Sequence, residues 1–105
     1  MIVVDAENYE QEVLQAEGLI VVDFWGTTCR NCKALRPKYE ALAEANAEVA
    51  KFCMFNAMEN KALSVAQKVI SVPTIVFYRN GVQIDRLSGT FTVEQIAVKV
   101  KELTA

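Results

Sequence analysis

The chain has 105 residues, 52% of them hydrophobic, which is enough to bury a core, so we expect a single domain over residues 1–105. Its net charge is −2, with Lys and Arg scattered among the acidic residues, which argues against the basic stripe of a nucleic-acid-binding protein. No apolar run approaches the ~20 residues that a membrane-spanning helix needs, so we expect no membrane partner.

Residues 1–24 predict a strand, a helix and a second strand. Ile2-Val3-Val4 is a short β-branched run, and Asp5 behind it is a good helix N-cap. Residues 6–17 fit an amphipathic helix, which a glycine then ends. Residues 19–24 are apolar on both faces with one exception, as is typical of a central strand.

The middle of the chain predicts a long helix, a strand and a shorter helix. Residues 29–48 carry apolar side chains at three- and four-residue spacing, and Pro37 within them predicts a kink or a local break. Residues 49–55 fit another strand, and residues 60–69 fit the shorter helix.

The remainder predicts a hairpin and a last helix. The strand 75–78 is followed by Asn80-Gly81, a strong hairpin signal, and the more polar return strand 82–88 is expected near an edge. Thr92 is a suitable N-cap for the final helix. The resulting order is β-α-β-α-β-α-β-β-α. Helical crossovers require parallel strands and the hairpin adds antiparallel ones, so we expect an α/β fold whose central mixed β-sheet has helices on both faces.

The segment Cys29-Arg30-Asn31-Cys32 lies between an apolar strand and a helix. Cys-x-x-Cys alone also occurs in metal sites, but this context favours a thiol–disulfide redox centre. Residues three apart on a helix are close enough to form a disulfide. Cys29 would lie at the helix N-terminus, which favours its thiolate and makes it the nucleophile. Cys32, one turn further and more buried, would resolve the mixed disulfide.

The cysteine and histidine counts restrict the chemistry further. Three Cys and no His exclude His-based catalysis and His-ligated metals, and three thiols fall short of a four-ligand zinc site. We expect no metal site within one chain. Few thiols and no signal-peptide pattern in the first residues favour a reduced compartment, the cytoplasm.

These features together resemble the thioredoxin family, and the resemblance spans essentially the whole chain. The matching segments, in the family's order, are Val22-Asp23-Phe24-Trp25, Cys29-x-x-Cys32-Lys33, Pro37, Lys51, Val72-Pro73-Thr74, Asn80-Gly81 and Gly89. The resemblance implies the thioredoxin fold. It also implies a dithiol–disulfide oxidoreductase that needs no cofactor beyond its own Cys29–Cys32 disulfide.

The resemblance also implies where a substrate binds. Pro73 would follow a cis peptide bond and face the cysteines, with the backbone near Val72 pairing to a substrate peptide. Trp25 would pack beside the active site, and Thr74 and Gly89 would complete the substrate-binding surface. The alternatives are a trans proline that begins a strand and a tryptophan that serves packing alone.

Asp23 interrupts the most apolar predicted strand, which is costly unless something compensates for it. We interpret it as a buried carboxylate beneath the cysteine pair, its pKa raised by desolvation, that takes the proton of Cys32 directly or through water. The alternative is an Asp that turns to solvent at the strand end. In similar proteins a lysine at the position of Lys51 lies near this acid, so Lys51 joins the expected catalytic group.

The chain departs from typical thioredoxins around the cysteines, where the family has Trp-Cys-Gly-Pro-Cys. Arg30 and Asn31 stand between the two thiols, and Thr28 replaces an aromatic residue. Arg30 places a cation near Cys29, which favours the thiolate and shifts the couple toward oxidation, or else it is a solvated residue of weak effect. Cys53 matches no catalytic position and is expected to be a small buried hydrophobe.

We therefore expect a monomeric protein-disulfide reductase, supplied with electrons by a thioredoxin reductase-type partner and acting on disulfide-containing proteins. No nucleotide-binding fingerprint is present, so reducing power must come from that partner. Three alternatives stay open: a thiol oxidant or isomerase-like protein, a dimer binding zinc or an iron–sulfur cluster through two cysteine pairs, and a non-catalytic binding module.

Overall fold

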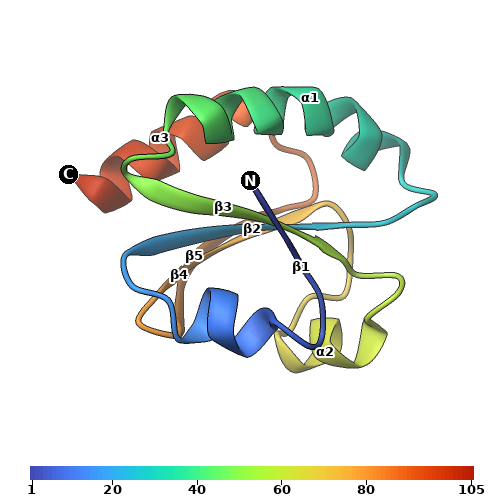
Figure 1. The fold of residues 1–105 in the computed structure, drawn as a ribbon. Coiled ribbons are helices and arrows are strands. Elements are labelled where there is room, and N and C mark those ends of the chain that lie inside the picture. Colours follow the sequence, from blue (N-terminus) through green and yellow to red (C-terminus); the bar gives the residue numbers. More distant parts are fainter.

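The structure is a computed structural model that describes residues 1–105, and it consists of a five-stranded sheet with helices on both faces (Figure 1). In chain order the elements are β1 (Ile2–Val4), η1 (Glu10–Leu14), β2 (Leu19–Trp25), α1 (Arg30–Ala45), β3 (Ala50–Asn56), α2 (Lys61–Ala66), β4 (Thr74–Arg79), β5 (Val82–Ser88) and α3 (Val93–Thr104).

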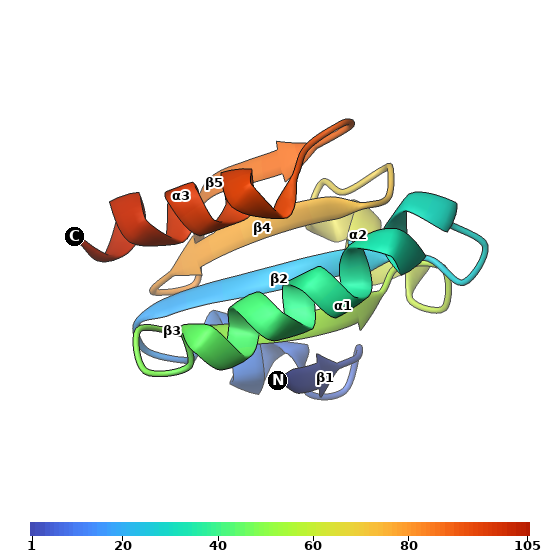
Figure 2. The same ribbon diagram turned by 90° about the horizontal axis from the view of Figure 1, so that it is seen from above.

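The strands lie in the order β1-β3-β2-β4-β5, so β2 is central and β5 is at an edge. β3 pairs in parallel with both β1 and β2, whereas β4 pairs antiparallel with β2 and β5. The expected mixed sheet is therefore confirmed, and so is the edge position of the return strand. Figure 2 shows α1 crossing over β2 and β3, with α3 beside β4 and β5.

Alternation along β2 divides its side chains between two apolar clusters. Ile20, Val22 and Phe24 belong to the cluster that η1 completes, whereas Leu19 and Val21 belong to the cluster shared with α1 and α3. Figure 1 shows these two layers: α1 and α3 lie on one side of the sheet, η1 and α2 on the other. Both faces of the central strand are thus buried, which explains its nearly continuous apolar sequence.

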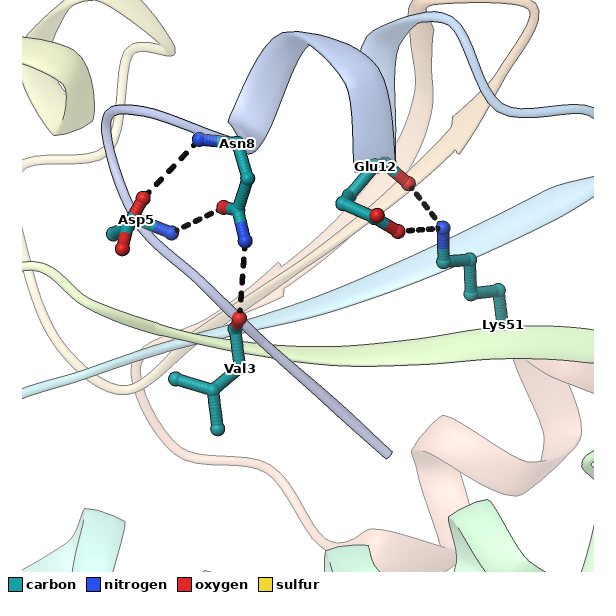
Figure 3. Close-up of polar contacts among 5 residues, drawn as sticks. All are labelled: Val3, Asp5, Asn8, Glu12 and Lys51. Carbon is teal, nitrogen blue, oxygen red and sulfur yellow. Dashed lines mark hydrogen bonds and ion pairs between the residues drawn. The ribbon is translucent and has the colours of Figure 1, made fainter.

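The first helix differs from the expected span 6–17, because it is a short π-helical segment that begins at Glu10. The Asp5 carboxylate accepts a hydrogen bond from the backbone N–H of Asn8, and Asn8 Oδ1 accepts one from the N–H of Asp5 (Figure 3). The same carboxylate also accepts from the N–H of Glu7. This reciprocal pairing holds residues 5–8 in a turn. Asp5 thus begins the segment as a capping residue, but the regular helix starts later.

The other helix boundaries follow from local hydrogen bonds. α1 ends at Ala45, three residues before the expected end, because the side chain and the backbone N–H of Asn46 both donate to the carbonyl of Leu42. The helix is continuous through Pro37, so of the expected kink or local break the break is not found. At the start of α3, Thr92 accepts from the N–H of Gln95 in a capping box, which confirms the expected N-cap.

Candidate active site

The two cysteines form a disulfide at the start of α1. The Cα atoms of Cys29 and Cys32 are 5.2 Å apart, inside the range of roughly 4.4–6.8 Å that a disulfide requires. Cys29 is the N-cap residue of α1, and its Sγ accepts a hydrogen bond of 3.1 Å from the backbone N–H of Cys32. Cys29 is half-buried, whereas Cys32 is 3% exposed. The pair thus consists of an accessible first sulfur and a buried second one.

The N-terminus of α1 favours negative charge on the sulfur of Cys29. The helix is 16 residues long and its first turn contains no acidic residue, so its free N–H groups and its dipole act on the sulfur unopposed. Arg30 and Asn31 are both exposed on this first turn. Because the thiolate is the nucleophile in disulfide exchange, this environment suits Cys29 to the attacking role.

Trp25 is the last residue of β2 and packs against the cluster on the α1 face. The guanidinium carbon Cζ of Arg36 lies 4.4 Å from the centroid of the tryptophan ring, a cation–π contact. Arg36 is one turn along α1 from Cys32, so this contact joins the carboxyl end of β2 to the helix that carries the disulfide. The sequence spacing of four from Cys32 is the signal that could have identified Arg36 as a site residue.

Asp23 is completely buried in the middle of the sheet, with 0% exposure. Neither carboxylate oxygen has a hydrogen-bonding partner in the protein. Burial raises the pKa of Asp23 from 3.8 to about 7, and the positive charge of Arg36 opposes the rise. The alternative of a carboxylate turned to solvent is therefore wrong. Asp23 alternates with Val21 and Trp25 toward the α1 face.

Lys51 lies on the opposite face of the sheet from Asp23. In the β2–β3 register it pairs with Ile20, a residue of the η1-side cluster, whereas the partner of Asp23 is the apolar Met54. The ammonium of Lys51 contacts Glu12 twice, at 2.6 Å from Oε2 and 2.8 Å from the backbone carbonyl. Figure 3 shows the lysine side chain rising from β3 to the helix that carries Glu12. The expected proximity of Lys51 to Asp23 is not found.

Pro73 and Gly89 lie together at one end of the β4–β5 hairpin. The Val72–Pro73 peptide bond is cis, as the resemblance implied. Pro73 and Gly89 share a shallow groove of about 280 Å³ with Asn31 of α1. Three of the residues named from the sequence, from three separate segments, therefore meet beside the start of the cysteine helix.

Val72 lines a second shallow pocket, of about 320 Å³, together with Met58 and Ile70. This pocket is more apolar than the first, and Ile70 is 91% exposed beside it. Thr74 differs from its neighbours, because its side chain is buried and its hydroxyl donates to the carbonyl of Ser71 at 2.7 Å. Its side chain is thus turned into the protein rather than toward a ligand.

Met58 is a site residue that the sequence did not suggest. Its Sδ accepts hydrogen bonds of 3.6 Å from the hydroxyls of Thr27 and Thr28, in the loop before Cys29. It also covers Gly26, where an added Cβ would lie 2.7 Å from the sulfur. The contact joins the loop after β3 to the loop after β2, and no local sequence pattern encodes it.

Three further features of the structure complete this description. Cys53 is a free, fully buried thiol whose pKa burial raises to about 11, which confirms its expected role as a small apolar residue. No three Cys, Asp or Glu side chains lie together in a way that could hold a metal ion. None of the helices has both the length and the apolar character needed to span a bilayer.

Comparison with known proteins agrees with this geometry. The family model for thioredoxin matches residues 1–102. A thioredoxin of Acetoanaerobium sticklandii is 35% identical over 88 residues, covering 84% of either chain. A thioredoxin of Peptoclostridium acidaminophilum is 33% identical over 84% of this chain and 80% of its own, and thioredoxin-2 of Saccharomyces cerevisiae is 34% identical over 80% of each. With its Cys29–Cys32 disulfide at the head of α1, the chain belongs to the thioredoxin family and is a dithiol–disulfide oxidoreductase.

Proposed function

We propose that the protein reduces disulfides in other proteins, with Cys29 as the nucleophile and Cys32 as the resolving thiol. The observation that carries this assignment is the difference between the two sulfurs. Cys29 is half-buried at the helix N-cap, where N–H groups favour a thiolate, and Cys32 is buried one turn behind it. A substrate disulfide can therefore reach Cys29 but not Cys32.

The reaction proceeds as two exchanges. The Cys29 thiolate attacks one sulfur of the substrate disulfide, which breaks the S–S bond, forms a mixed disulfide and releases the other substrate sulfur as a thiolate. Cys32 then loses its proton and attacks the sulfur of Cys29. The second substrate thiolate leaves, and the Cys29–Cys32 bond closes. The substrate gains two electrons and the protein loses two.

Asp23 is the group that we assign to the proton of Cys32. Its carboxylate is buried, has no hydrogen-bonding partner in the protein, and lies on the face of β2 that α1 covers. A pKa raised to about 7 divides Asp23 between its two protonation states near neutral pH, which suits a group that takes up and later releases a proton. The transfer is direct or passes through water.

The substrate peptide binds, in this proposal, across the segment that ends at the cis proline. The backbone near Val72 pairs with the peptide, and Pro73, Gly89 and Trp25 form the surface that faces it. The two grooves support this placement, because one is lined by Pro73 and the other by Val72, and they leave space for side chains that flank the substrate cysteine. The buried side chain of Thr74 supports the strand beneath and takes no part in contact.

The electrons come from a partner of the thioredoxin reductase type, because the chain carries no redox group besides its own disulfide. We further propose that residues 1–105 act as one domain and one monomer, and that the protein works in the cytoplasm, where the substrates are disulfides formed transiently. No external cofactor enters the cycle.

Two single substitutions test the order of the thiols. Cys32→Ser should accumulate a stable mixed disulfide with a disulfide-containing protein such as insulin, because the first exchange proceeds and the second cannot. Cys29→Ser should accumulate none and should lose reductase activity. Equal trapping by both variants, or reductase activity retained by Cys29→Ser, would contradict the assignment.

A second candidate function, a thiol oxidant or isomerase, is favoured by one observation. Arg30 is an exposed cation within the first turn of α1, next to Cys29, and a cation there stabilises the reduced, thiolate form. Equilibration of the Cys29–Cys32 pair in poised thiol buffers decides between the two functions: a potential near about −270 mV indicates a reductant, and one near about −180 to −120 mV indicates an oxidant. A zinc and iron assay on the same sample tests metal binding by two chains.

A further inference from the structure

The charges that face Asp23 come from α1 alone. The neighbours of Asp23 in the sheet are Met54 on β3 and Ile75 on β4, which are both apolar. α3 adds only apolar side chains to the cluster on this face. From α1, Arg36 is the charged group that acts on Asp23. The sulfur of Cys32 faces the same side of the helix one turn earlier.

The path of α1 over β2 places Arg36 at the level of Asp23. The hydroxyl of Tyr39 donates to the carbonyl of Val21 at 3.2 Å, and the guanidinium of Arg36 lies 4.4 Å from the ring centroid of Trp25. α1 therefore runs back along β2, in the direction opposite to the strand. Asp23 lies between Val21 and Trp25 on the same face, beneath the turn of α1 that carries both contacting residues.

Arg36 is held in this place and keeps its charge. Its guanidinium is fixed over the face of Trp25 by the cation–π contact, and the residue is half-buried, so water screens its charge less than it screens an exposed one. The guanidinium group of arginine carries a positive charge throughout the physiological pH range. Lys51 cannot replace it, because Lys51 is engaged with Glu12 on the other face.

We propose that Arg36 is a positioning residue that keeps Asp23 ionised often enough at neutral pH for it to accept the proton of Cys32. The inference rests on the proposed function for the step that it serves, the proton transfer. The effect of the Arg36 charge on Asp23 is inferred for the folded protein with the Cys29–Cys32 disulfide formed. Arg36 acts through Asp23 and through the ring that holds it, without contact to the substrate.

The test compares three substitutions in the oxidised protein. Arg36→Gln removes the charge and keeps most of the length of the side chain, and Arg36→Lys keeps the charge. Lys51→Gln is the matched control, because it removes the same charge from the opposite face. The readout is the carboxyl carbon NMR titration of Asp23, assigned by its loss in Asp23→Asn. A purely structural role of Arg36 would not move this titration.

We expect Arg36→Gln to shift the Asp23 titration upward by about one pH unit, a change of the size that loss of an opposite charge produces. Arg36→Lys should keep the midpoint of the Asp23 titration close to the wild-type value, and Lys51→Gln should leave it unchanged. Equal titrations of wild type and Arg36→Gln would overturn the inference, as would equal shifts in Arg36→Gln and Lys51→Gln. If Arg36→Gln fails to fold, Arg36→Met replaces it, because it also removes the charge and keeps a long side chain. The same upward shift is expected, and equal titrations of wild type and Arg36→Met would contradict the proposal.

A second readout separates this inference from the proposed function. The pH profile of mixed-disulfide resolution in Arg36→Gln should move upward by the same amount as the Asp23 titration. A profile that stays in place while the titration moves would overturn the role of Arg36 in the proton transfer. A profile that Asp23→Asn also leaves in place would instead overturn Asp23 as the proton acceptor.

Discussion

Asp23 and Lys51 are charged residues on adjacent strands, but they differ in burial and in whether an opposite charge pairs with them. Lys51 is partly exposed, with 30% of its side chain accessible, and it is neutralised by Glu12. Asp23 is fully buried and its carboxylate has no hydrogen-bonding partner. A paired, half-exposed charge costs little and stabilises a structure modestly. A buried, unpaired one costs several kcal/mol, which marks Asp23 as a candidate functional group.

The largest expected effect is on stability, through Asp23→Asn in the oxidised protein. Because the pKa of Asp23 rises from 3.8 to about 7 on folding, the folded state binds the proton more tightly, and stability falls as pH rises through that interval. Removing the carboxyl should stabilise the protein above pH 7 by up to about 4 kcal/mol and should have little effect below pH 4. Urea unfolding at pH 4 and pH 8 measures the difference.

Asp85 supplies the matched control for this prediction. Its carboxylate accepts a hydrogen bond from the ammonium of Lys99 in an ion pair, which holds the pKa of Asp85 below its usual value. That contribution is present above the ordinary pKa of an Asp and disappears as pH falls through the lowered one. Asp85→Asn should therefore destabilise the protein slightly at pH 8, the opposite sign to Asp23→Asn. Destabilisation by both variants at pH 8 would contradict the cost assigned to Asp23.

Tyr39→Phe tests whether every polar group on the Asp23 face is functional. The hydroxyl of Tyr39 donates to the backbone carbonyls of Val21 and Cys53, at 3.2 and 2.9 Å, and so serves the sheet rather than Asp23. We expect a loss of about 1–2 kcal/mol in stability and an unchanged rate of disulfide reduction per folded molecule. A tenfold loss of rate without a loss of stability would place Tyr39 in the chemistry.

A double-mutant cycle on Lys51 and Glu12 tests the other face. Lys51→Ala and Glu12→Gln should each cost about 1 kcal/mol or less, with a coupling of the same order, and neither should alter the pH profile of reduction. Denaturant unfolding measures the changes in the free energy of unfolding, and an insulin-reduction assay measures the pH profile of reduction. A shifted profile in Lys51→Ala would return Lys51 to the catalytic group expected from the sequence.

The smallest effect is expected for Gly26→Ala in the loop before Cys29. The added Cβ would lie 2.7 Å from Sδ and 3.0 Å from Cγ of Met58, but this side chain is flexible and 39% exposed, so it can move aside. We expect a loss below about 1 kcal/mol. The double variant with Met58→Ala, measured by thermal unfolding, should abolish this loss, and a loss that persists would show that the loop backbone itself resists the side chain.

The contrast between Asp23 and Lys51 also shows where prediction from sequence succeeds. The apolar run of β2, the asparagine–glycine turn and the capping threonine of α3 are local signals, and each element that they predict is confirmed. Asp23 was identified for the same reason, because a charge inside an apolar strand is a local anomaly. The position of the cysteines at the head of α1 follows from adjacent residues in the chain.

What the sequence could not predict depends on register and on long-range contact. Side chains alternate across a sheet, so the face on which Lys51 lies depends on its pairing with Ile20, and a shift of one residue would reverse it. The resemblance alone placed Lys51 beside Asp23, where the structure has Met54. The contact of Arg36 with Trp25 likewise depends on how α1 crosses β2, which no local pattern encodes.

Stopped-flow reduction of an aromatic disulfide reagent tests the role of Asp23 most directly. The first thiol released reports attack by Cys29 and the second reports resolution by Cys32, in wild type and in Asp23→Asn across pH 5–9. For wild type we predict a second phase that rises with pH near pH 7, where Asp23 titrates. Asp23→Asn should show an equal first phase, no such rise, and a second phase slowed by about tenfold or more at pH 7. Superimposable second phases at every pH would contradict the account.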